Sequence, residues 1–394
     1  MKKILFVAIS ATLLAAGCQK TEIINQVSGD AMTFTTAMSK LTKAVGTADA
    51  DQTNGLLNLQ AQDFKVWTYK AFTDEVNGDA PGQVYDGMTA LDVTYGTQWT
   101  TTKDYYWPGT NKSLDFFAVS TKLWPVAEVK DETGNVTTPA VAGVTVGIEG
   151  AGLEIGNRKL TVSGYTVDAS NPNDDLMVAE FVRQHQGMND KKVNLHFNHA
   201  LAKVQFRFTT NPGDDKIEVK SLKVAGLSTT GTLTVSENGN VAANNGRVPV
   251  KLEWTGQDTP EVFTDDYDGN LELKAPETVT EGATTTVVNN DKEFATWLVL
   301  PQGITGKTVT IAYDITSTTG GTRSFEQTFA LTRPAVAVEE VKDGETVVTE
   351  GKEAFAEWKI NQVVIYTINL SPNKITFDPS VEPWDEAENL SDQN

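Results

Sequence analysis

The sequence predicts an all-β protein made of two β-sandwich domains in tandem. Apolar residues recur with a period of two, as in KTVTIAYDITS, where Val309, Ile311 and Tyr313 share one face. Many such short runs are separated by Asn-Gly, Asp-Gly and Gly-Gly pairs, which are typical of turns between strands. No amphipathic helix longer than about three turns is visible, and this pattern is typical of β-sandwiches.

Length and charge limit the class of protein. The chain has 394 residues, enough for two domains with apolar cores. Its 32 Lys and Arg against 52 Asp and Glu give a net charge of −20. A nucleic-acid partner is therefore not expected, because nucleic-acid binding needs a basic surface.

The N-terminus predicts a secreted lipoprotein. Lys2 and Lys3 precede an apolar run, and small residues follow it, so residues 1–17 form a signal peptide. That run is shorter than the roughly 20 residues that span a bilayer. Cys18, the only cysteine, ends the motif LLAAGC, which resembles a bacterial lipobox. We expect Cys18 to carry diacylglycerol and acyl lipid, which anchors the chain in a membrane. No other cofactor is expected.

The remaining chain divides into three predicted parts. Residues 18–54 form a lipidated tether and a propeptide strand, MTFTTAMSK, in which Phe34 points inward. The first sandwich extends over residues 55–186 and the second over 187–394, with polar HQGMNDKK between them. Residues 363–384 alternate as a C-terminal strand segment.

The run VNLHFNHALAKVQFRF changes parity within one apparent strand. Its apolar residues occupy odd positions up to Phe197 and even positions from Val204. A continuous strand would turn one of these sets to solvent, so a break is predicted near residues 199–203. His196 and His199 would then point to opposite faces, which favours a structural role for them over a metal site.

No catalytic motif was found in the sequence, and neither an enzyme nor a metal site is expected. An aromatic cluster could instead stack on sugar rings if it were exposed, although dense apolar neighbours favour a core role. It consists of Trp99, Tyr105, Tyr106, Trp107 and Trp124.

Several motifs occur in an order that resembles the fimbrillin family of the Bacteroidales. They are FKVWTYK, YYWPGTNKSLDFFAVS, NDDLMVA, VNLHFNHALAKVQF, WLVLPQG, NQVVIYTINL and ITFDPSVEPW. The resemblance implies two transthyretin-like sandwiches and a role as a pilus subunit that reaches the cell surface as a lipoprotein. It also implies that a protease removes the first strand and that a neighbouring subunit's strand fills the groove.

The strand exchange implied by the resemblance has candidate residues in this chain. Family stalk subunits are cut after arginine, but the first arginine here is Arg158, which leaves Lys40 and Lys43 as cleavage candidates. As a donor, the C-terminal segment is expected to add little to the stability of its own subunit. The donor candidates are Ile375, Phe377, Val381 and Trp384.

Two functions remain open at this point. The first is a structural or accessory subunit, such as an anchor or tip, of an outer-membrane fimbria that serves cell adhesion. Its partners would be other pilus subunits and a host or bacterial surface receptor. The alternative is a surface lipoprotein that does not polymerise and binds glycans through exposed aromatic residues.

Overall fold

The computed structural model describes most of the chain from Asp30 onward. Among these residues, helix is confined to one turn at 59–62 and to the 3-10 turn η2 (Asn189–Lys191), so the predicted all-β fold is confirmed. No helix of the described part has the length and apolar character needed to cross a membrane. The described residues are 30–38, 59–131, 133, 136–167, 174–210, 215–238, 246–274, 277–281, 284–288, 292–334, 338–342, 345–349, 354–371 and 374–383.

A large sheet gathers nine of the described strands. Its main path is β1 (Thr33–Met38), β12 (Lys192–His199), β10 (Met177–Ala179), β5 (Leu114–Ser120), β2 (Phe64–Lys70), β3 (Leu91–Tyr95) and β4 (Trp99–Thr100). Two further strands pair beside this path, namely β11 (Phe181–Gln184), which joins β5, and β15 (Arg247–Val248), which joins β11.

The large sheet curls until the two ends of its path meet. β1 and β4 stand at opposite ends of the strand order, yet they are in contact. The indole Nε1 of Trp99 donates a buried hydrogen bond of 2.9 Å to Oγ1 of Thr36. The curled sheet encloses an apolar cluster that includes Phe64, Phe116 and Phe197. β1 therefore closes the seam of a barrel-like layer.

A second sheet, the shared sheet, has six of the described strands, two of them very long. β14 pairs with β16 from Glu237↔Val250 at one end to Ile217↔Leu273 at the other, with three irregular positions between. β21 pairs with one half of β14 and β9 with the other half. The strands are β22 (Thr322–Ala330), β21 (Thr308–Thr316), β14 (Lys216–Glu237), β9 (Lys159–Thr166), β8 (Thr145–Glu149) and β16 (Val250–Leu273).

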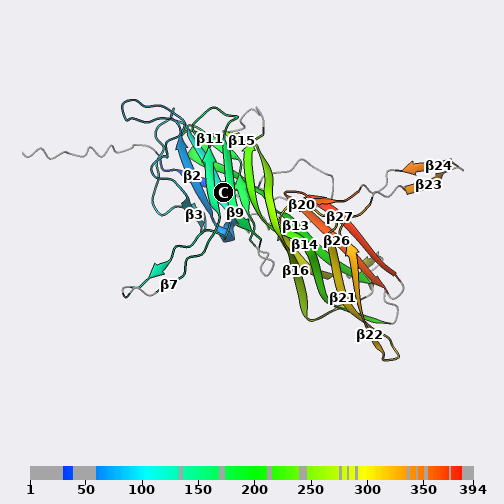
Figure 1. The fold of residues 1–394 in the computed structure, drawn as a ribbon. Helices are drawn as coiled ribbons and strands as arrows, with labels where there is room; N and C mark the ends of the chain where they lie inside the picture. Colours follow the sequence, from blue (N-terminus) through cyan, green and yellow to red (C-terminus); the bar gives the residue numbers. More distant parts are fainter. Residues whose placement is uncertain are drawn as a thin grey trace, which may run out of the picture.

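A small sheet of four strands packs over the half of β14 that pairs with β21, where Phe263 of β16 contacts Trp297 of the small sheet. Figure 1 shows the large and small sheets toward opposite ends of the shared sheet. One cluster of buried side chains joins all three, with Phe117 from the large sheet, Leu233 from the shared sheet and Phe206 from the small sheet. The small sheet contains β19 (Lys292–Val299), β13 (Ala202–Thr210), β26 (Gln362–Ser371) and β27 (Lys374–Pro383).

Short strand pairs extend from these layers. Figure 1 shows β7 and the β23–β24 hairpin projecting away from the three sheets. The pairs are β6 (Val129–Lys130) with β7 (Val136–Thr138), β17 (Glu277–Glu281) with β18 (Thr284–Val288), β20 (Gln302–Gly303) with β25 (Glu357–Trp358), and β23 (Val338–Lys342) with β24 (Glu345–Thr349).

The predicted break in VNLHFNHALAKVQFRF is confirmed. β12 ends at His199 in the large sheet, and β13 begins at Ala202 in the small sheet. The buried apolar positions are odd in β12 and even in β13, because the chain changes sheet between them.

The division of the chain at residues 186 and 187 stays a prediction. Strand pairing crosses it at β11 with β15 and at β9 with β14. The order of the strands along the chain does not predict this pairing across the boundary, because neighbouring strands in space come from distant parts of the chain.

Candidate functional site

β1 lies in a slot between two other strands. It runs parallel to β12, with pairs from Thr33↔Lys192 to Met38↔Phe197. Its opposite side contacts β4 through the hydrogen bond between Trp99 and Thr36. β1 is the first of the described strands along the chain, so the rest of the sheet follows it in sequence. It can therefore be removed without cutting any other described strand.

The side chains of β1, and of Met32 directly before it, fill an apolar trough. Met32, Phe34 and Met38 are each less than a tenth exposed and belong to the cluster inside the curled sheet. The Phe34 ring lies edge-on to Phe64, with 6.2 Å between their centroids. This confirms the inward orientation predicted for Phe34. Burial of these three side chains contributes about 4–9 kcal/mol in gross terms, at about 1.5–3 kcal/mol each.

Polar contacts hold the residues that precede β1. Asp30 forms an ion pair of 2.6 Å with Lys191 and accepts a hydrogen bond of 2.9 Å from Gln186. Hydrogen bonds from Lys191 and Gln186 lower the pKa of Asp30. The backbone N–H of Met32 donates to the carbonyl oxygen of Tyr105 at 2.7 Å. β1 is thus fastened both by apolar burial and by polar contacts near its first residues.

Four candidate residues lie outside the described residues. The lipidation candidate is Cys18, the cleavage candidates are Lys40 and Lys43, and the last donor candidate is Trp384. Lys40 and Lys43 follow β1 closely in sequence, because the strand ends at Met38.

The first arginine of the chain is buried in a charged cluster. Arg158 is 1% exposed, and its guanidinium lies 2.9 Å from Asp115 and 2.6 Å from Glu237. Arg183 makes two further bonds of 2.7 Å to Asp115. These side chains link β5 and β11 of the large sheet to β14 of the shared sheet. In the folded protein an arginine-directed protease cannot reach Arg158.

The C-terminal candidates lie on β27, which pairs with β26 from Gln362↔Pro383 to Ser371↔Lys374. Ile375 and Phe377 are partly buried against the core, whereas Val381 is 45% exposed. The Phe377 ring stacks on Tyr366 at 5.0 Å and on Phe329 at 5.6 Å. The expectation that this segment adds little to its own subunit is therefore wrong for this structure. Alternation predicts a strand but does not say which neighbour receives its apolar face.

The aromatic cluster is part of the core, as its apolar neighbours indicated. Trp99, Tyr105 and Trp107 are buried. Trp124 is half-buried and packs against Trp67, with 6.1 Å between ring centroids. Only Tyr106 of the five is exposed. This cluster therefore offers no aromatic platform for a sugar.

The two histidines point to opposite faces of β12, as predicted. His199 is buried, and its Nδ1 lies 2.9 Å from a carboxylate oxygen of Asp175. His196 is half-buried, and burial together with the charge of Arg247 lowers its pKa to about 4. Within the described residues, no group of three or more His, Cys, Asp or Glu side chains is arranged to hold a metal ion.

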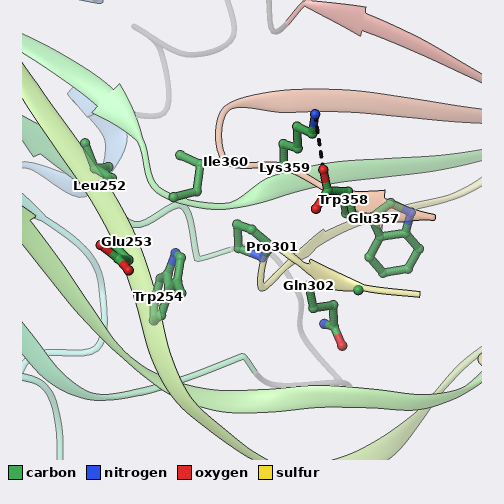
Figure 2. Close-up of a pocket in the computed structure, with 10 residues that line it drawn as sticks. Leu252, Glu253, Trp254, Pro301, Gln302, Glu357, Trp358, Lys359 and Ile360 are labelled. Carbon is green, nitrogen blue, oxygen red and sulfur yellow. Dashed lines mark ion pairs between the residues drawn. The ribbon is translucent and has the colours of Figure 1, made fainter. Parts of the chain in front are cut away.

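A pocket that the sequence did not reveal lies where β16 passes β20 and β25. It has a volume of about 460 Å³. Its apolar wall consists of Leu252 and Trp254 from β16 with Pro301 and Ile360 (Figure 2). Leu252 and Trp254 alternate in KLEWTGQ, but this pattern predicts only a strand. The rest of the lining comes from residues 301–303 and 357–360, which follow about 50 and about 100 positions later in the chain.

Charged side chains stand at the same pocket. Figure 2 shows Glu253, Glu357 and Lys359 around it, with a dashed line between the last two. The Lys359 ammonium lies 3.1 Å from the Glu357 carboxylate, and both side chains are well exposed. The pocket therefore combines two tryptophans, Trp254 and the buried Trp358, with donors and acceptors of both charges.

The fold and the slot define a class of protein, an all-β protein whose first described strand, β1, lies between β12 and β4. A family model described as fimbrillin-like matches residues 42–384. The chain therefore belongs to the fimbrillin-like family. This membership identifies a structural, fimbrial protein rather than an enzyme.

Solved structures with a similar course of the chain come from species of Bacteroides. A fimbrial protein of Bacteroides vulgatus is 18% identical, with a TM-score of 0.47, and the match covers 90% of this chain and 100% of that one. A candidate cell adhesion protein of Bacteroides uniformis is 13% identical, with a TM-score of 0.38, and the match covers 90% and 98%. No curated protein matches the sequence. The family assignment rests on the family match alone.

Proposed function

We propose that the chain is a structural or accessory subunit of an outer-membrane fimbria, assembled by strand exchange. Proteolysis after Lys40 or Lys43 releases β1, and a strand of a neighbouring subunit takes its place. The observation that carries the proposal is the position of β1 in a slot between β12 and β4. Removing β1 uncovers backbone groups of β12 and an apolar trough, which together form a template for an added strand.

A strand of a second copy fits this slot by the spacing of its side chains. The slot holds Met32, which directly precedes β1, and then Phe34, Thr36 and Met38 of β1 at alternate positions, and β27 presents Ile375, Phe377, Pro379 and Val381 with the same spacing. Parallel entry in this register puts Phe377 where Phe34 packs on Phe64. The exchange leaves the Trp99 indole without its Thr36 partner, a loss of about 1–3 kcal/mol.

The donor strand has to leave its own subunit before it can enter another. Phe377 then exchanges its contacts with Tyr366 and Phe329 for contacts in the neighbour's trough. The net gain of the exchange is therefore smaller than the gross burial in the slot. Strand exchange can occur only after cleavage, because an intact β1 occupies the slot.

A lysine-directed cut is compatible with the burial of Arg158. Lipid on Cys18 would hold the precursor in the outer membrane until the cut separates the tether from the sandwiches. A chain that keeps β1 would instead remain attached to the membrane as an anchor subunit or as a surface lipoprotein that does not polymerise.

Cross-linking tests the exchange and its register together. In the full-length Cys18→Ser chain, engineered cysteines are the only thiols. In β1, Thr35 stands opposite Asn194, and the proposed register puts Asp378 of the donor in that place. We expect Asn194→Cys with Asp378→Cys to give ladders with a short bis-maleimide linker after limited trypsin treatment, and none before it.

The control carries Asn194→Cys with Thr376→Cys, which stands two residues away in the proposed register. Ladders from this control instead would mean that strands exchange in another register. If size-exclusion chromatography finds only monomers after cleavage, strand exchange is wrong and the chain is a surface lipoprotein that does not polymerise.

A further inference from the structure

We propose that the pocket beside Trp254 binds a neutral pyranose sugar of a glycan. The pocket uses no residue of β1 or β27, so this inference does not depend on strand exchange. A pyranose ring has an apolar face formed by C–H groups and a rim of hydroxyls. It therefore needs a flat apolar surface beside closely spaced hydrogen-bond donors and acceptors.

Trp254 supplies the flat surface and is held in a fixed orientation. Its indole Nε1 donates to the carbonyl oxygen of Ala200 at 2.7 Å, and its ring packs against Tyr165 at 5.6 Å. A side chain at Gly231 would meet the indole ring at 3.0 Å, so the glycine lets the ring lie close to β14. A ring that is already ordered costs little conformational entropy on binding.

Glu357 and Lys359 supply an acceptor and a donor side by side. Their carboxylate and ammonium are 3.1 Å apart, a separation comparable with that of neighbouring hydroxyl oxygens on a pyranose. One hydroxyl can donate to the carboxylate while the next accepts from the ammonium. Glu253 on the opposite side of the pocket provides further acceptors.

The charge of the lining favours a neutral sugar over an acidic one. Two carboxylates, Glu253 and Glu357, and one ammonium, Lys359, line the pocket, and Lys251 outside the lining pairs with Glu253 at 3.3 Å, in a chain of net charge −20. A sialic or uronic acid would bring a further negative charge to this site. The volume of about 460 Å³ lies within the range of about 300–1,000 Å³ typical of ligand sites.

The chain next to the pocket also carries an unsatisfied polar atom. Asn361 follows the lining residue Ile360, adopts a left-handed φ of 57° and is only 4% exposed. Its Oδ1 has no hydrogen-bond partner among the described residues. A buried polar atom without a partner is costly and is often associated with a functional site.

Titration of the full-length chain in detergent tests the proposal. The probes are the methyl glycosides of glucose, galactose, mannose and N-acetylglucosamine, with sialic acid as the acidic comparison. Saturation-transfer NMR and tryptophan fluorescence report binding. We expect millimolar dissociation constants for at least one neutral glycoside and binding of sialic acid weaker by at least about fivefold.

Variants link the signal to the pocket. Lys359→Met and Glu357→Gln change exposed side chains, so the fold should persist while affinity falls by about fivefold or more. Trp254→Phe should retain part of the affinity, whereas Trp254→Ala should abolish it. Lys223→Met, which changes an exposed lysine of β14 outside the lining, is the matched control and should bind like the parent.

Three outcomes would overturn the proposal. One is the absence of binding by all four neutral glycosides at tens of millimolar in the folded parent chain. Another is binding that Lys359→Met and Glu357→Gln leave unchanged. The third is tighter binding of sialic acid than of any neutral glycoside. Each can be observed whether or not the chain polymerises.

Discussion

Phe377 tests whether β27 is docked on its own subunit before assembly. Its ring is stacked between Tyr366, at an interplanar angle of 24°, and Phe329, at 4°. Phe377→Ala removes both ring contacts and leaves the backbone pairing with β26 in place. We expect the variant to have a lower free energy of unfolding than the parent chain.

The magnitude follows from burial and ring contacts. Full burial of a phenylalanine contributes about 1.5–3 kcal/mol, and a partly buried ring such as Phe377 about 1 kcal/mol. Each aromatic pair adds about 0.5–1.5 kcal/mol. Two pairs and the burial together give an expected loss of about 2–4 kcal/mol.

Urea unfolding of the full-length Cys18→Ser chain, followed by circular dichroism and tryptophan fluorescence, measures this loss. Val381→Ala on the same strand is the matched control, because Val381 is 45% exposed and its truncation should change stability by less than about 0.5 kcal/mol. If Phe377→Ala is as mild as this control, β27 is not docked on β26 in solution. The prediction that the C-terminal segment adds little to the stability of its own subunit would then be right.

Three further changes give equally direct readouts. Cys18→Ser should move the chain from the detergent phase to the aqueous phase in a partition assay, since no other cysteine can carry lipid; continued detergent partitioning would locate the anchor elsewhere. Burial, with a smaller effect of Arg247, lowers the pKa of His196 from 6.5 to about 4, so the unfolded chain binds an extra proton between these pH values. Stability should therefore fall as the pH drops through this window and fall less in His196→Gln; equal acid sensitivity in urea titrations would contradict the assignment. Arg158→Met should cost about 3–5 kcal/mol, because it leaves the Glu237 carboxylate buried without its partner, and adding Glu237→Met should restore part of the loss. A double variant less stable than the single one would refute this account.

The sequence predicts the features of this fold that depend on local alternation. The parity change after Phe197 predicts the passage from β12 to β13, because a pleated strand cannot bury both sets of side chains. The inward orientation of Phe34 follows from the same periodicity, and the core role of Trp107 follows from its dense apolar neighbours. These properties depend on a few neighbouring residues.

Features that join distant segments were not predictable from the sequence. Alternation within β14 and β16 is the same whether each is one long strand or two short ones. The sequence pattern therefore does not show that each strand is continuous across two layers. No local sequence pattern predicts the ion pairs of Arg158 with Asp115 and Glu237, because only the fold brings these charges together. The pocket likewise needs Trp254 and Lys359, which are about a hundred residues apart.

The continuity of β14 and β16 has a mechanical consequence. The large and small sheets pack toward opposite ends of these two strands, and strand structure is unbroken from Lys216 to Glu237 and from Val250 to Leu273 (Figure 1). A pull along the long axis loads the antiparallel pair in shear, and its hydrogen bonds, which are perpendicular to the strands, share the force. Separating the two ends requires many of these bonds to break together. The molecule should therefore resist tension along these two strands.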